Sequence, residues 1–377
     1  MSDEAFDEIE QVLRSGGSEA GFDFLARKFR EEKNYPLLFE ARLMQKRREL
    51  GLPLIRIELP EDLPVETRRG YEEAYVQVAR EVGSLFLADG DIPRAWPYFR
   101  AIGETAPVAS AIEPLEPRDG MDAIIEIAFY ERVHPRKGFE LILANYGMCR
   151  AISYFEQFPG REGRDASLRL LVRTLHHDLA ARLKRAIAAQ EGAEPETESI
   201  PDLIAGRDWL FGQYDYYIDT SHLVSVIRFS VEASDRETLA MALELTEYGR
   251  RLSSMFQYRG EPPFEDTHVD YGLYLRALLG EDLDAAVAHF RGKLPEGDPK
   301  EAVSGPAQVL VGLLARLGRH AEAIEVSLRH LAHVDPNQLA CPSVPQLCQM
   351  AGDYGRLMKL AREQGDLLSF TAASIQL

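Results

Sequence analysis

Long apolar runs are missing from this chain of 377 residues. No window comes near the roughly 20 mainly apolar residues that a helix needs to span a bilayer. The opening residues, MSDEAFDEIE, contain neither a basic segment nor an apolar one, so they do not match a secretory signal. We therefore expect no membrane span, and we expect the protein to act in the cytoplasm.

Positive charge is also scarce. The chain has 43 Lys and Arg residues against 61 Asp and Glu residues, which gives a formal net charge of −18 at pH 7. Such a surface repels the phosphates of nucleic acids and the headgroups of anionic membranes. The composition therefore excludes DNA, RNA and anionic lipid as expected partners, and it leaves a protein, a peptide or a small molecule.

Cysteine and the common catalytic motifs are sparse or absent. The three cysteines, Cys149, Cys341 and Cys348, have no CxxC spacing, which predicts free thiols in a reducing compartment. The sequence contains no GxGxxG, GxxxxGK[ST], HExxH or GxSxG motif. We therefore predict no cofactor from motifs, and the sequence assigns no catalytic residue.

Strand patterns are rare as well, and helical patterns fill most of the chain. The best strand candidate is LIRIELP, at 54–60, which has no second strand to pair with. By contrast, the segment 165–190 repeats apolar residues at steps of three and four, with Asp165 as its expected N-cap. Proline-rich and glycine-rich breaks separate further segments of this kind. The sequence predicts an all-α fold.

Four stretches share one pattern, in which a helix ends near a glycine and a second helix begins with small residues. They are LFLADGDIPRAWPYFRAI, LRALLGEDLDAAVAHFRGKL, LARLGRHAEAIEVSLRHL and CQMAGDYGRLMKLARE. Glycine permits the left-handed end of the first helix, and alanine lets the second helix approach closely. The pattern predicts helical hairpins that pack against one another.

These stretches resemble the tetratricopeptide repeat (TPR) family over about 71–102 and 273–368. The resemblance implies an αα-hairpin superhelix, a TPR-like solenoid, and a binding function. The segment in between departs from the pattern. We therefore expect TPR-like hairpins at 1–104, a divergent central helical block with the candidate site at 105–270, and TPR-like hairpins at 271–377.

Three histidines follow an acidic residue by three positions, and on a helix such a pair can bind iron or manganese. A metal-dependent enzyme, of hydrolase or oxygenase type with iron, manganese or zinc, is therefore one hypothesis. Its ligands would be His134, His222, His268, Asp219, Asp266 and Glu131. In the competing interpretation, Asp219 and Asp266 are helix N-caps, and the histidines after them are neutral residues of the core. His134 would instead end the helix that precedes HPRKG.

The other hypothesis is an interaction scaffold that binds a peptide, a protein or a small ligand in the concave face of the central block. Aromatic residues gather in this part of the chain, where they form either core or the wall of a groove. The residues that we expect to line the groove are Tyr130, Tyr214, Tyr217, Tyr271 and Arg228. The sequence leaves open whether the protein is an enzyme.

Overall fold

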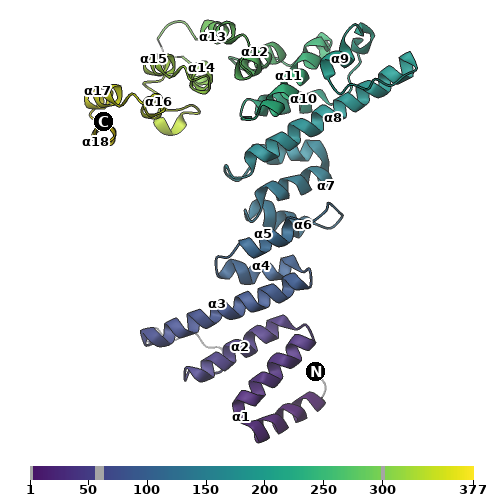
Figure 1. Ribbon diagram of the computed structural model, residues 1–377, viewed down its shortest axis with the longest axis vertical. Helices are drawn as coiled ribbons and strands as arrows, with labels where there is room; N and C mark the ends of the chain where they lie inside the picture. The colour runs from purple at the N-terminus through teal and green to yellow at the C-terminus, as the bar shows by residue number, and fades with distance from the viewer. Residues whose placement is uncertain (1–2, 56–62, 299–301) are drawn as a thin grey trace. The chain divides into compact units, whose positions relative to one another are not determined.

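The structure is a computed structural model that describes residues 3–55, 63–298 and 302–377 (Figure 1). Within these ranges the chain forms helices and no β-strand; a single isolated bridge joins Arg259 and Asp266. The predicted all-α fold is confirmed. Most of the predicted strand at 54–60 lies outside the described residues. None of the described helices is long and apolar enough to cross a membrane.

The chain divides into two compact units, Met1–Arg164 (unit 1) and Asp165–Leu377 (unit 2). The division into three blocks stays a prediction.

The helices of unit 1 are α1 (Asp3–Glu31), α2 (Tyr35–Glu49), α3 (Val65–Ala88), α4 (Ile92–Ala101), α5 (Ala106–Ile112), α6 (Asp122–Ile125), the π-helix η1 (Glu126–Tyr130) and α7 (Pro135–Glu156). Most of these helices pack against the next helix in the chain, and α6 packs against α4 and η1.

The α3–α4 hairpin shows why this sequence turns where it does. Gly90 has φ +77°, a conformation that ends α3 at little cost for glycine. Phe99 of α4 is fully buried against Gly83 of α3, where an added Cβ would lie 2.7 Å from its ring. The glycine that ends the first helix is the one that the repeated pattern predicts.

Unit 2 contains the remaining helices. They are α8 (Arg164–Glu191), α9 (Ile200–Ile204), η2 (Asp208–Phe211), α10 (Thr220–Ser230), α11 (Arg236–Arg251), η3 (Ser254–Phe256), α12 (Thr267–Leu278), α13 (Leu283–Gly292), α14 (Gly305–Arg316), α15 (His320–His330), η4 (Pro336–Gln338), α16 (Val344–Ala351), α17 (Tyr354–Gln364) and α18 (Leu367–Gln376). The predicted N-cap Asp165 is wrong, because α8 already begins at Arg164 and Asp165 lies in its first turn.

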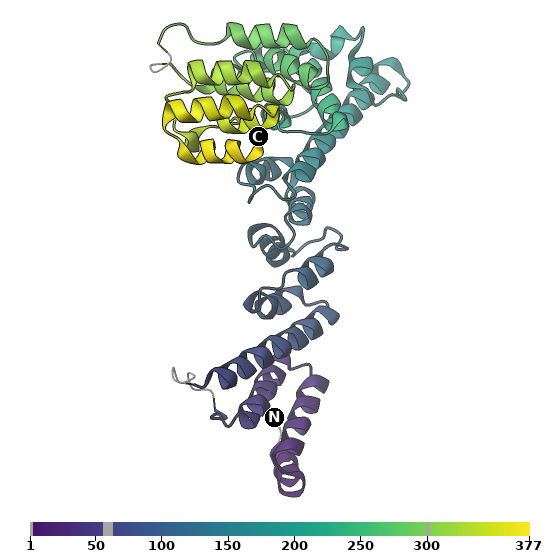
Figure 2. The ribbon, with the colours of Figure 1, turned by 60° about the vertical axis from the view of Figure 1, so that its left-hand side comes forward.

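From α10 onward, each long helix of unit 2 contacts the next, and α12 also contacts α10 and α14. Figures 1 and 2 show α16, α17 and α18, in yellow, side by side at the end of the chain. Buried side chains of consecutive hairpins form one core, which includes Phe290, Leu310, Ile324 and Leu347. This packing brings α10, α12 and α14 together around the loop 257–266.

Candidate functional site

The two predicted metal ligands of unit 1 are both engaged with other side chains. His134 Nε2 contacts the Glu113 carboxylate, and Glu131 pairs with Arg100 at 3.1 Å. The prediction that His134 ends a helix is wrong, because His134 is the N-cap residue of α7 with φ −152°. The reason is Pro135, which is favourable at the first position of a helix and excludes a helical conformation for the residue before it.

In unit 2, Asp219 and Asp266 are N-caps, as one of the two interpretations predicts. Asp219 Oδ1 accepts hydrogen bonds from the backbone N–H of Ser221 at 2.8 Å and from its hydroxyl at 2.6 Å. The hydroxyl bond, together with the backbone bonds, lowers the pKa of Asp219 below its usual value. Asp266 Oδ1 accepts from the N–H of Val269 at 3.3 Å. Both carboxylates therefore stabilise the first turn of a helix.

His268 is buried in the core of unit 2, with 1% of its surface exposed. Neither ring nitrogen has a hydrogen-bond partner among the described residues. Burial lowers the pKa of His268 to about 4, so the ring is neutral at pH 7. His222, by contrast, is half-buried at the start of α10.

The structure does not gather the predicted ligands around one point. Across the described ranges, no three His, Cys, Asp or Glu side chains are placed so that they could hold a metal ion.

A buried ionic cluster that was not predicted from the sequence lies close to His268. Asp270 is 1% exposed, and its carboxylate accepts hydrogen bonds from His289 Nε2 at 2.7 Å and from Lys293 Nζ at 2.6 Å. It also accepts from the backbone N–H of Asp266 at 2.9 Å. A buried carboxylate needs such partners, because removing a charge from water is costly. The only signal in the sequence is an aspartate among the mainly apolar residues of α12.

Lys293 connects this cluster to the loop 257–266. Its ammonium group donates to the backbone carbonyl of Pro263 and to the Glu265 carboxylate, each at 2.7 Å, besides Asp270. Burial alone would lower the pKa of Lys293, but the hydrogen bonds to Asp270 and Glu265 raise it above its usual value. The charged amine therefore fixes the position of the loop.

The loop separates two hollows. The inner hollow, of about 490 Å³, lies between the loop and helices α10, α12 and α14. Its lining consists of Val224, Ser225, Arg228, Arg259, Gly260, Glu261, Pro262, Pro263, Phe264, Thr267, Tyr271, Gly305 and Val309.

Two of the predicted groove residues, Tyr271 and Arg228, meet in the inner hollow. The Tyr271 ring stacks on Phe264 with 3.9 Å between ring centroids and 1° between planes. Burial raises the pKa of Tyr271 to about 12, against a smaller opposing effect of the Arg228 charge. The hydroxyl is therefore protonated at neutral pH and can donate a hydrogen bond.

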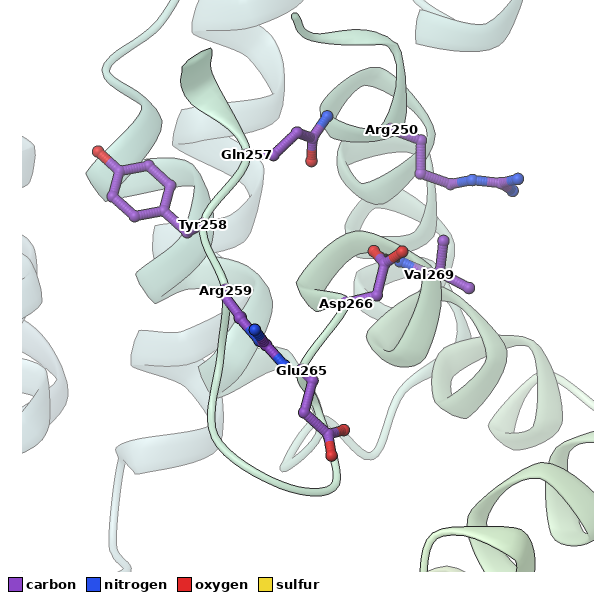
Figure 3. Close-up of a pocket in the computed structure, with 7 residues that line it drawn as sticks. All are labelled: Arg250, Gln257, Tyr258, Arg259, Glu265, Asp266 and Val269. Atoms are coloured by element: carbon purple, nitrogen blue, oxygen red, sulfur yellow. Dashed lines mark hydrogen bonds between the residues drawn. The ribbon is translucent and has the colours of Figure 1, made fainter. Parts of the chain in front are cut away.

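The outer hollow, of about 570 Å³, lies on the other side of the loop, and Figure 3 shows its lining. Arg250 comes from α11 and Asp266 from the N-cap of α12, while Arg259 and Gln257 belong to the loop. The Gln257 amide donates to the carbonyls of Gly249 and Leu252, each at 2.9 Å. These bonds hold the loop against the end of α11. The outer hollow is more open than the inner one.

The other predicted groove residues do not line the inner hollow. Tyr130 belongs to unit 1, where its ring packs edge-on against Phe129 and Tyr154. Tyr214 is 69% exposed, and Tyr217 is half-buried beside Tyr248, whose hydroxyl accepts from its backbone N–H at 2.9 Å. Arg259 lines both hollows, and sequence reasoning did not select it because it lies in a proline-rich connector without a helical pattern.

Comparison with known proteins gave no match to any family model, to any curated protein or to any solved structure.

Proposed function

We propose that the chain is a helical-repeat interaction scaffold, an αα-hairpin superhelix with TPR-like hairpins at both ends. Its ligand, a peptide, a protein or a small molecule, binds in unit 2 at the inner hollow, and the protein acts in the cytoplasm. From α10 to α18 each α-helix packs on the next, and α12 also contacts α10 and α14, which supports the repeat architecture.

One observation carries the binding function. Arg228, Arg259 and Tyr271, from three separate segments, line one half-enclosed hollow whose other walls are largely apolar. A concave site with apolar walls and a few convergent polar groups is typical of ligand-binding sites in proteins. Its volume of about 490 Å³ suits a small molecule or one or two side chains of a peptide.

The rest of the lining supports binding more than catalysis. The described residues that line the inner hollow include no histidine, cysteine or lysine that could act as base or nucleophile. The metal-dependent alternative requires at least three ligands around one ion, and the described residues offer no such group. We therefore propose the scaffold alone.

The test fills the inner hollow and leaves the outer one open. Peptides that bind the full chain are selected from a random dodecapeptide display library. Small molecules that bind it are identified from a fragment library by ligand-observed NMR. Val309→Trp places an indole in the inner hollow, and Val269→Trp is the matched control because Val269 lines the outer hollow. We expect binders that lose affinity for Val309→Trp and keep it for Val269→Trp.

Binders that are equally sensitive to both substitutions, or no binders from either library, would contradict the proposal. Thermal unfolding of both variants shows whether each keeps the fold of the parent protein.

A further inference from the structure

Tyr271 contributes a hydrogen-bond donor that the described residues do not use. Only 7% of the residue is exposed, and its hydroxyl has no hydrogen-bond partner among the described residues. The hydroxyl is not among the fully buried unpaired atoms, so a molecule from solution can reach it. Because Tyr271 lines the inner hollow, a molecule in that hollow can supply the acceptor.

Two cations line the same hollow. Arg259 is exposed, and its guanidinium makes no hydrogen bond or ion pair with any described residue. Arg228 reaches close enough for its charge to act on the Tyr271 hydroxyl. Among the described residues of the lining, the only acidic one is Glu261, which is exposed on the loop. In a chain with a net charge of −18, this lining has more positive than negative groups and so favours an anion.

The remaining walls limit which anion fits. Val224, Pro263, Phe264 and Val309 are apolar, and the volume of about 490 Å³ is larger than a bare inorganic ion needs. An apolar wall gains free energy only when it covers apolar surface of the ligand. Guanidinium groups and a phenol hydroxyl together match the planar, two-oxygen geometry of a carboxylate.

We infer that the inner hollow binds a small organic acid, whose carboxylate lies between Tyr271, Arg228 and Arg259 and whose apolar body rests on Val224 and Val309. This inference rests on the proposed binding function and names its ligand class. Tyr271 and Arg259 determine the specificity, since they contribute a hydroxyl and a guanidinium group to the lining of the hollow.

The experiment compares an acid with its uncharged analogue on the full chain. Isothermal titration calorimetry measures the binding of 4-phenylbutyrate, of 4-phenylbutanamide and of inorganic phosphate. We expect the acid to bind at least tenfold more tightly than the amide or the phosphate. Tyr271→Phe keeps the ring that stacks on Phe264 and removes only the hydroxyl, so it should weaken binding of the acid about tenfold.

Arg259→Gln should weaken binding of the acid by a similar factor. Arg250→Gln should leave binding of the acid unchanged, because Arg250 lines the outer hollow and a second site but not the inner hollow. The inference would be overturned if the amide or the phosphate bound as tightly as the acid. It would also be overturned if the two arginine substitutions had equal effects on binding of the acid. If none of the three probes binds but peptides sensitive to Val309→Trp are selected, the ligand class is wrong and the scaffold stands. If none of the three probes binds and no such peptides are selected, both proposals fail.

Discussion

The imidazole ring of His268 lies directly on the backbone of Gly249, so that α12 and α11 approach one another without an intervening side chain. A Cβ at position 249 would lie 2.3 Å from two atoms of the ring, well inside contact distance. Gly249 is helical and buried, so the glycine is required here by the close approach and not by its backbone angles. This contact lies immediately behind the loop that forms both hollows.

Gly249→Ala should therefore destabilise the protein, although alanine normally favours helix. The added methyl group forces the His268 ring or α11 to move, and overpacking of this kind costs about 1–3 kcal/mol in the free energy of unfolding. Gly312→Ala is the matched control, because nothing lies within 4 Å of the added Cβ in α14. It should be neutral or stabilise by up to about 1 kcal/mol. Urea unfolding monitored by circular dichroism gives both values; equal effects would show that the ring does not restrict position 249.

Burial of the neutral His268 ring makes stability depend on pH. The pKa is about 4 in the folded state and about 6.5 when the chain unfolds. Above pH 6.5 both states are neutral and nothing is lost. As the pH falls below 6.5, His268 is protonated in the unfolded state but stays neutral in the folded state. The free energy of unfolding therefore decreases, by about 2 kcal/mol at pH 5.

This pH dependence is isolated by comparison with His268→Leu, which cannot titrate. Between pH 7.5 and pH 5, the wild type should lose about 2 kcal/mol more of its free energy of unfolding than His268→Leu loses. His177→Leu is the control, because His177 is exposed on α8 and should give no such shift. A wild type that loses no more stability than His268→Leu over this range would mean that the ring is protonated in the folded protein.

Lys293 holds both the buried Asp270 and the loop, so Lys293→Met should affect stability and local motion together. Removing one partner of a buried ion pair leaves the other uncompensated, at a cost of about 3 kcal/mol or more in the free energy of unfolding. The backbone amides of 257–266 should also exchange with deuterium faster, because the bond to the Pro263 carbonyl is lost. Arg291→Met, which breaks a half-exposed pair with Glu322, should cost less than about 1 kcal/mol and leave the loop unchanged.

Much of the helical fold can be predicted from the sequence because its signals are local. The turn at Gly90 and the caps Asp219 and Asp266 depend on residues within a few positions of one another. His134 was misplaced because the helix before it ends early, in the π-helix η1, and Pro135 begins a new one. No local pattern separates these two outcomes for a residue that precedes a proline.

The site could be predicted only in part, because it depends on pairs far apart in the chain. Arg228 was selected as an arginine of the central block and Tyr271 as an aromatic residue directly after it, and the packing of α10 on α12 brings them together. His289 and Asp270 are 19 positions apart on different helices, and no sequence motif relates the two residues. Such contacts follow from tertiary packing, which a single sequence does not specify residue by residue.

The N-cap of α10 gives a final prediction. Asp219→Ala removes the acceptor for the N–H of Ser221 and His222 and should cost about 1 kcal/mol, whereas Asp219→Asn keeps a cap and should cost less. Because the pKa of Asp219 is lowered in the folded state, the charged cap stabilises the protein above the unfolded pKa, near 4, and this contribution is lost as the pH falls through the folded value. Wild type and Asp219→Ala should therefore converge in stability at acidic pH.

Asp178→Ala, at an exposed position within α8, should change stability by less than about 0.5 kcal/mol in urea unfolding at pH 7. An Asp219→Ala variant as stable as Asp178→Ala at pH 7 would rule out a stabilising cap.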